Sequence, residues 1–280
     1  MPRLACALIV LLVAAAGEAG AQDFSVKTKI RDARNPGKPP VGQSVTLFHA
    51  GKVYDCLDSG NRMTVFEPAQ ERFVIIDSSR RVAATISLSE LGDWLYQEDK
   101  RLEGELSKRK SEPDRWDVQL ADFQLHPVFQ SRFDAAKKSL ELSSRVMTYS
   151  VKCDKSNPVQ LGEAYLDYAD WAARLNYIMI PQAAFPGPRL QLNEALRRQQ
   201  LLPVEVSWKL NRTNGTHLIA QHQYNWKLES RDRDLILEWE KLLRDPGIKT
   251  VPLDQLLFPA KPSAKGEKLR PSARPVSSRK

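Results

Sequence analysis

The chain has 280 residues, of which 42% are hydrophobic, and a formal charge of +8. This length is enough for one large domain or two small ones with a substantial core. The charge is uneven, because residues 261–280 hold seven Lys and Arg against one Glu, whereas residues 22–260 carry a net charge of only +2. A nucleic-acid-binding fold concentrates basic residues on a folded face, so this distribution argues against specific nucleic-acid binding.

The first residues have the pattern of a secretory signal peptide. Arg3 precedes an apolar run over residues 4–16, and the small residues Ala19 and Ala21 flank Gly20 as at a cleavage site. A membrane anchor needs roughly 18 to 20 apolar residues, which neither this run nor any later segment supplies. We expect residues 1–21 to be removed on export, which would leave a soluble protein in the periplasm or outside the cell.

Alternating apolar residues predict a series of short strands after the signal. A loop at 31–40 and the short turns Ala50-Gly51, EPAQ and DSSR separate them, and parallel neighbours would need crossovers of a dozen or more residues. The pattern therefore predicts an antiparallel meander. Its expected strands cover residues 24–30, 43–49, 52–57, 62–66, 71–77 and 82–86.

The strand at 71–77 differs from the others. Phe73, Val74, Ile75 and Ile76 are apolar at consecutive positions, so both faces of this strand are expected to be covered.

A helix is predicted directly after the meander. Ser87 and Glu90 form a capping box, and leucines then recur at helical spacing until the charged stretch SKRKSEPDR, which we interpret as a surface connection. Further strands are expected in VFQSRF, SLELSS and RVMTYSVKC, although DAAKK could instead extend a helix.

The remainder of the chain alternates helix and hairpin patterns. From Pro158 an apolar stripe predicts a helix of about twenty residues, and RLQLNEALRRQQ predicts another. Residues 204–210 and 218–228 predict a hairpin around NRTNGT, in which Asn211 and Asn214 match glycosylation acceptors but also suit a turn. Ser230 is the expected N-cap of a last helix, although Arg233 stands where a capping box needs Glu or Gln.

No motif for catalysis or metal binding is present. The histidines lack metal-ligand spacing, and the chain has no GxSxG, SxxK or phosphate-binding glycine loop. Glu163, Asp167 and Asp170 share one stripe of a predicted helix, roughly opposite its apolar face, and are expected to be solvated. We expect a protein that is not an enzyme and needs neither cofactor nor metal; the alternative is a hydrolase with a dispersed site.

Two cysteines would remain after export, Cys56 and Cys153. An oxidising compartment favours a disulfide between them, and a bridge closing so long a loop would stabilise the fold by about 4 to 5 kcal/mol if the geometry allowed it. The alternative is a buried free thiol at Cys153, which shares the apolar parity of its strand with Tyr149 and Val151.

Aromatic residues mark one face of the predicted C-terminal hairpin. Trp208, Tyr224 and Trp226 share the inward parity of neighbouring strands. They either fill a core or, together with Phe73 and Ile75, line a cavity between sheet and helices that binds an apolar ligand.

The last residues, 259–280, are too poor in apolar residues to fold and are expected to be a disordered basic tail. Such a tail either attracts an anionic envelope polymer or lipid headgroups, or only solubilises the chain.

The order of elements resembles that of a known family. Gly51-Lys52-Val53-Tyr54, the strand ending Phe66-Glu67-Pro68 and the apolar strand 72–77 are similar to the meander of periplasmic lipoprotein-sorting carriers. The chain also resembles uncharacterised exported bacterial proteins of similar length. The resemblance implies a half-open antiparallel barrel whose concave side, covered by helices, shelters acyl chains. This chain departs from those carriers in its long helical region, residues 158–200, and in its basic tail.

Together these observations predict an α+β fold in which residues 22–258 form a single domain. Its curved antiparallel sheet, like a half-barrel, is covered by amphipathic helices. The expected function is non-enzymatic binding of a lipid, a lipidated protein or another apolar ligand. The alternative is an envelope interaction or structural protein with a filled core.

Overall fold

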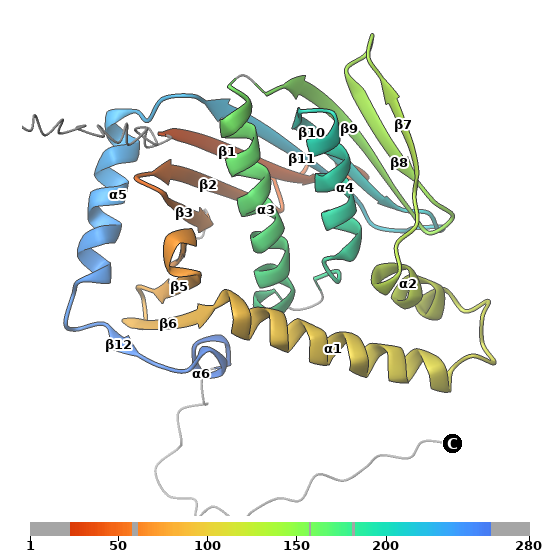
Figure 1. Cartoon of the computed structure of the whole chain (residues 1–280), viewed down its shortest axis with the longest axis horizontal. Coiled ribbons are helices and arrows are strands. Elements are labelled where there is room, and N and C mark those ends of the chain that lie inside the picture. Colours follow the sequence, from red (N-terminus) through yellow and green to blue (C-terminus); the bar gives the residue numbers. More distant parts are fainter. Residues whose placement is uncertain (1–22, 58–60, 157, 181–182, 259–280) are drawn as a thin grey trace, which may run out of the picture.

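The computed structural model describes residues 23–57, 61–156, 158–180 and 183–258, so the predicted signal peptide and basic tail lie outside the described residues. The described chain is α+β, with six α-helices and twelve strands in one open, mostly antiparallel sheet (Figure 1). The strands are β1 (Phe24–Asp32), β2 (Gly42–His49), β3 (Lys52–Leu57), β4 (Arg62–Glu67), β5 (Arg72–Asp77), β6 (Val82–Ser87), β7 (Gln130–Asp134), β8 (Ser139–Ser143), β9 (Met147–Lys155), β10 (Leu201–Leu210), β11 (His217–Asn225) and β12 (Lys249–Thr250). The helices are α1 (Leu88–Lys108), α2 (Trp116–Leu125), α3 (Val159–Met179), α4 (Gly187–Arg198), α5 (Ser230–Leu243) and α6 (Leu253–Leu257).

The predicted antiparallel meander is confirmed. The sheet runs β12-β6-β5-β4-β3-β2-β1-β11-β10-β9-β8-β7, and only the short β12–β6 pair is parallel. The turn between β2 and β3 has Ala50 at φ 50° and Gly51 at φ 73°, the positive angles of a tight hairpin turn. Strand β1 pairs with β11 from Ser25 opposite Asn225 to Asp32 opposite Leu218, which joins the two ends of the described chain in one sheet.

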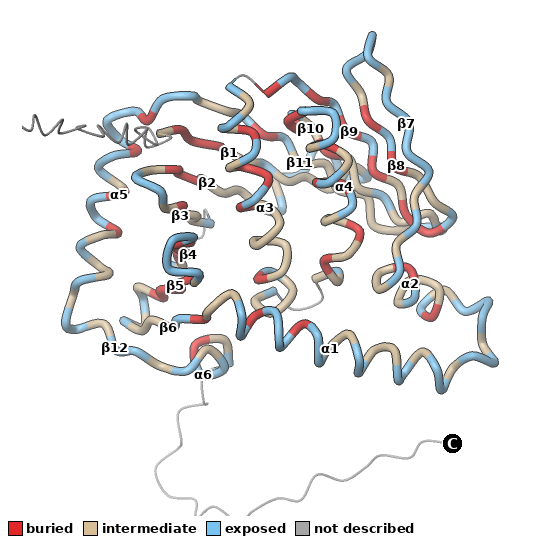
Figure 2. The backbone as a smooth tube through the Cα atoms, in the orientation of Figure 1, coloured by how far each residue is buried: buried red, intermediate tan, exposed pale blue. Residues whose placement is uncertain are grey.

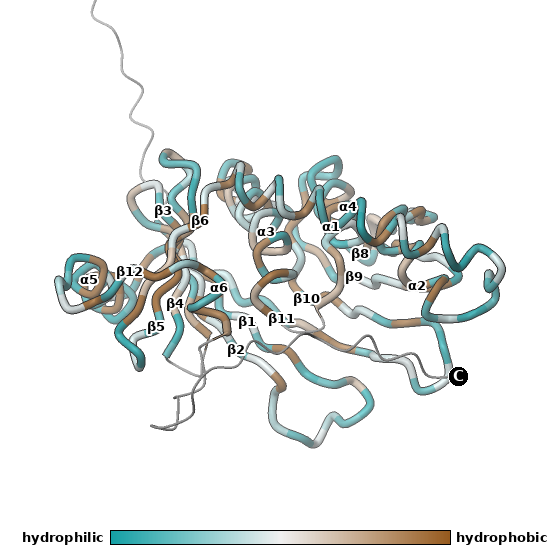
Figure 3. The backbone as a smooth tube through the Cα atoms, turned by 90° about the horizontal axis from the view of Figure 1, so that it is seen from below, coloured by the Kyte–Doolittle hydropathy of each residue, from teal (hydrophilic) through white to brown (hydrophobic). Residues whose placement is uncertain are grey.

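Strand β5 is covered on both faces, as its sequence predicts. Phe73 and Ile75 belong to one apolar cluster, and Val74 and Ile76 belong to a second cluster on the other face. We call the face that bears Phe73 the inner face and the opposite face the outer face. Helices α3 and α5 lie on opposite sides of β4 and β5 (Figure 3).

Helix α3 packs on the inner face through tyrosines. The Tyr168 ring lies 5.9 Å from that of Phe48 and 6.1 Å from that of Phe66, and its hydroxyl donates to Asp55 at 2.9 Å. Helix α4 is tied to α3 by Asp170, which accepts from Asn193 at 2.6 Å and from Arg197 at 2.7 Å. Asp170 is therefore only partly solvated, unlike Glu163 and Asp167, which are exposed as expected.

Helix α5 packs on the outer face through one aromatic pair and one ionic cluster. Trp239 is buried and stacks on Tyr54 at 6.1 Å between ring centroids. Beside this pair, Glu240 accepts from the Tyr54 hydroxyl at 2.5 Å and from Lys52 at 3.1 Å. Burial, with the Glu240 carboxylate second, raises the pKa of Tyr54.

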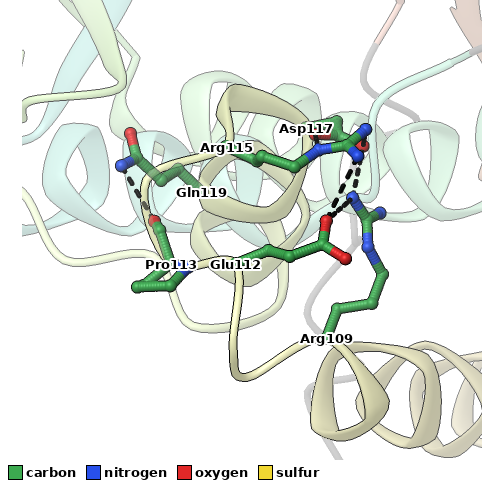
Figure 4. A network of polar contacts seen from close by, with 6 residues as sticks. All are labelled: Arg109, Glu112, Pro113, Arg115, Asp117 and Gln119. Atoms are coloured by element: carbon green, nitrogen blue, oxygen red, sulfur yellow. Dashed lines mark hydrogen bonds and ion pairs between the residues drawn. The ribbon is translucent and has the colours of Figure 1, made fainter.

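Helix α1 begins at the predicted capping box, in which Ser87 accepts from the Glu90 amide and Glu90 accepts from the Ser87 amide. The predicted surface connection follows it and is held by exposed ionic contacts (Figure 4). Arg109 contacts Asp117 at 2.8 Å and Glu112 at 3.2 Å, and Gln119 donates to the Pro113 carbonyl at 3.0 Å. Exposed pairs of this kind stabilise a fold only slightly.

Several local expectations are corrected. Residues 135–138 of DAAKK form a turn and do not extend a helix. The N-cap of α5 is Glu229, one residue before the expected Ser230, because this position places Asp232 at the third helical residue, where its carboxylate accepts from the Glu229 amide at 3.1 Å. Helices α2 and α6 and strand β12 were not predicted.

The possible disulfide between Cys56 and Cys153 does not form. Cys56 lies on β3 and Cys153 on β9, with four strands between them, and the two side chains belong to clusters on opposite faces. Neighbouring strands are about 4.8 Å apart, so five spacings separate the two residues by about 24 Å along the sheet, against a limit of about 7 Å between the Cα atoms of a disulfide. Cys153 is the buried thiol of the alternative interpretation, and burial raises its pKa to about 11.

Candidate functional site

The five residues predicted to bind a ligand lie on the inner face but form two separate groups. Phe73 and Ile75 on β5 have no exposed surface. Trp208 lies on β10, and Tyr224 and Trp226 lie on and just after β11, so at least four strands separate them from β5. The structure therefore does not bring the five side chains together at one place.

Tyr224 and Trp226 of the second group pack into an aromatic cluster. Tyr224 stacks on Trp226 at 5.4 Å and meets Tyr165 of α3 edge to face at 5.3 Å. Trp226 also lies 5.6 Å from the ring of Phe24 and remains 36% exposed at the rim of the sheet. These contacts are those of core packing, the first of the two interpretations of the aromatic pattern, and not of a ligand cavity.

A cleft opens on the same face further along the sheet, between α4 and the hairpin of β7 and β8. Its volume is about 410 Å³, and we call it the α4 cleft. Its residues are Phe129, Ser131, Phe133, Leu140, Leu142, Gln191, Glu194, Ala195, Arg198 and Gln199. Most of β7 is exposed, whereas β8 alternates buried and exposed residues (Figure 2).

The sheet supplies the apolar floor of the α4 cleft. Leu140 and Leu142 alternate with Glu141 on β8 and are buried, and Phe133 on β7 pairs with Leu140. Phe133 is 37% exposed, whereas Leu140 and Leu142 lie buried beside it. The floor thus leaves apolar surface accessible to a ligand.

Helix α4 supplies a polar wall. Gln191, Glu194, Ala195 and Arg198 recur at i, i+3, i+4 and i+7 and so share one face of the helix. Arg198 donates to Glu194 at 2.9 Å, while the other face of α4 is buried through Leu192 and Leu196. The cleft is therefore amphipathic, with a charged pair at its rim.

Ring contacts hold the inner end of the floor in place. Phe129 meets Phe123 of α2 edge to face at 5.0 Å and lies 5.9 Å from Tyr149 of β9. Burial raises the pKa of Tyr149 to about 12, so this phenol remains neutral in the physiological range. Helix α2 thus fixes the position of a cleft residue.

Two polar pairs lie under α3, away from the cleft. Asp55 accepts from Tyr168 at 2.9 Å and from Thr46 at 3.0 Å, and burial raises the pKa of its carboxyl. Nδ1 of His222 lies 3.0 Å from the Thr28 hydroxyl, and burial lowers its pKa to about 3. Its Nε2 is buried and has no hydrogen-bond partner in the part of the chain that the structure describes.

The closest approach to a nucleophile and base is Ser207, whose hydroxyl lies 2.8 Å from Nε2 of His217. No carboxylate contact orients His217 among the described residues, and an orienting group is the third member of such a site. Within the described ranges no cluster of His, Cys, Asp and Glu could hold a metal ion. No described helix combines the length and the apolar character needed to cross a membrane.

Sequence reasoning missed the α4 cleft for two reasons. Residues 129–143 were ambiguous between strand and helix, and α2, which fixes Phe129, was not predicted. One signal was present, because Phe129, Ser131 and Phe133 alternate in step with Leu140 and Leu142. Two neighbouring strands of matching parity predict one shared apolar surface.

Comparison of the chain with known protein families and with curated protein sequences finds no match.

Proposed function

We propose that the protein is a non-enzymatic exported protein that binds an apolar chain, such as that of a lipid or a lipidated partner, in the α4 cleft. The observation that carries this proposal is the apolar floor of Phe133, Leu140 and Leu142 beside the polar wall of α4. An apolar chain would lie on the floor, and a polar headgroup would remain at the rim near Glu194 and Arg198.

The size and position of the cleft support this proposal. Its volume of about 410 Å³ lies within the range of roughly 300 to 1,000 Å³ that small-molecule sites occupy. It lies between sheet and helices, where the resemblance to lipoprotein-sorting carriers implies an acyl-chain site. In this proposal the sheet is a curved half-barrel, α1, α3 and α4 cover its concave side, and the uncovered end beyond α4 is the entrance.

Binding of a fluorescent fatty acid, dansyl-undecanoic acid, tests the proposal. Wild-type protein should bind it saturably. Ala195→Phe should weaken binding at least tenfold, because a ring on the inner surface of α4 would occupy the cleft. Phe133→Ser should weaken it by several-fold, because it removes exposed apolar floor. Native mass spectrometry should detect co-purifying lipid on the wild-type protein and not on Ala195→Phe.

Leu237→Ser is the matched control, since it removes an exposed apolar side chain from α5, on the other face of the sheet. It should bind the probe like the wild type. The proposal is wrong if the folded wild-type protein shows no saturable binding, or if Ala195→Phe and Leu237→Ser bind equally well.

The second candidate is an interaction protein of the envelope with a filled core. A basic groove on the outer face favours it.

A further inference from the structure

A groove lies on the outer face of the sheet, on the opposite side from the α4 cleft. It runs between α5 and strands β11, β1, β2 and β3 and has a volume of about 620 Å³. Along α5 it is lined by Arg231, Leu235 and Trp239, which follow one another at i, i+4 and i+8 and so form one stripe of the helix. We call it the α5 groove.

The strands place two lysines side by side on the floor. Lys27 and Lys29 lie two residues apart on β1, so both point to the same face with a spacing of about 6.8 Å. Gln223 and Gln221 of β11 stand directly opposite them, and Val45 of β2 stands beside Lys27. Lysine and glutamine side chains therefore form the middle of the floor.

The groove has a strong positive charge. Lys27, Lys29 and Arg231 are exposed, and none of the three forms an ion pair with a described residue. None of the described lining residues is acidic. Glu205, which accepts from Gln221 at 3.0 Å, is already paired with Lys152 at 2.8 Å.

Apolar side chains lie beside the lysines in the groove. Val45 of β2 stands next to Lys27, and Leu235 and the buried Trp239 line the groove from α5. The floor therefore places apolar surface directly beside positive charge.

We propose that the α5 groove binds an extended acidic segment of a partner protein. Two carboxylates at alternate positions would match the spacing of Lys27 and Lys29, since alternate side chains of an extended chain are also about 6.8 Å apart. A following apolar side chain would lie against Val45 and Leu235. Because both lysines lie on the floor beside α5, a thin peptide chain reaches them more readily than the flat surface of a bilayer.

The test uses a labelled peptide with glutamates at two alternate positions followed by leucine, and the same peptide with glutamines. Wild-type protein should bind the acidic peptide saturably, and at least tenfold more tightly than the neutral one. Lys27→Gln, Lys29→Gln and Arg231→Gln combined should weaken binding at least about tenfold, as expected for the loss of three partly exposed charge contacts. Raising the salt concentration should weaken wild-type binding.

The matched control combines Lys108→Gln, Lys110→Gln and Arg145→Gln, which removes the same charge from exposed positions outside the groove. It should bind the acidic peptide within twofold of the wild type. Absence of saturable peptide binding, or equal loss in both triple variants, overturns the proposal. So does groove-dependent binding to anionic phosphatidylglycerol vesicles without peptide binding, since this result would assign the groove to lipid headgroups. Fatty-acid binding in the α4 cleft should be unchanged in both variants, so the two proposals are tested separately.

Discussion

His222 is the buried residue whose protonation couples folding most directly to pH. It lies on the inner face beneath α3, close to Tyr165 and Tyr224, with its ring contacting the Thr28 hydroxyl. Burial, and secondarily the charge of Arg189, lower its pKa from 6.5 to about 3. The folded state therefore holds His222 neutral over a range in which the unfolded chain binds a proton.

This difference predicts a loss of stability in acid. As the pH falls below 6.5, only the unfolded state gains the proton, so the free energy of unfolding should fall until about pH 3. Between pH 8 and pH 5 the contribution of His222 is about 2 kcal/mol. His222→Asn removes this contribution. The fall in the free energy of unfolding from pH 8 to pH 5, measured by urea unfolding at both pH values, should therefore be smaller by about 2 kcal/mol in the variant than in the wild type. Equal drops would contradict the assigned burial of this ring.

At the scale of single elements, Glu229 and Ser230 at the start of α5 have different roles. Glu229 accepts from the third helical amide, and Asp232 accepts from the Glu229 amide, so the capping box is built around Glu229. Ser230 is exposed and already helical. The roles of these two residues can be separated by alanine substitution.

Glu229→Ala should lower the free energy of unfolding by about 0.5 to 1 kcal/mol through loss of the cap. Ser230→Ala should leave it unchanged or raise it slightly, because alanine is the better helix former. Chemical denaturation of both variants measures the difference. A larger loss of stability in Ser230→Ala than in Glu229→Ala would show that Ser230 is the N-cap.

Most elements could be predicted from the sequence because their signals are local. The Ser87–Glu90 box, the alternation along β1 and the turn at Ala50-Gly51 each need only a few neighbouring residues. Helix α2 has no side-chain cap at Arg115 and almost no separation of polar and apolar faces, so it has no local signal. Strand β12 has only two residues and depends on pairing with β6.

At the scale of the whole molecule, the sheet is continuous from β12 to β7 and includes both ends of the described chain. The pairing of β1 with β11 is the one strand pairing between strands β1–β6 and strands β7–β11 of the described chain. Helix α3 crosses it, with Tyr168 on one side and Tyr165 on the other. The two groups of strands should therefore unfold together.

We expect one cooperative transition in urea. Tryptophan fluorescence reports on both faces of the sheet, since Trp239 lies on the outer face and Trp208 on the inner face, and far-UV circular dichroism reports on the backbone. The two midpoints should coincide. Separate midpoints would show that the junction between β1 and β11 does not couple the two halves.

The long-range features could not be predicted from local patterns. The pairing of β1 with β11 joins residues about 190 positions apart, and the α4 cleft joins the β7–β8 hairpin to a helix some 50 residues later. The positive α5 groove was hidden as well, because Lys27, Lys29 and Arg231 are close only after the sheet and α5 assemble. The alternation of Phe73 and Ile75 suits a filled core as well as a ligand pocket. Only the packing of the folded chain distinguishes these two interpretations.

The two edges of the sheet differ in what lies beside them. Beside β6 lie β12 and α6, with Arg80 donating to the carbonyls of Gln255 and Leu256, whereas β7 has no strand neighbour on its outer side within the described chain. Within the described chain, the five-residue edge of β7 thus offers more free backbone groups for strand-to-strand association between molecules than the two-residue edge of β12. Two copies joined through β7 would have used up the free backbone groups of that edge, so growth through β7 alone would stop at a pair.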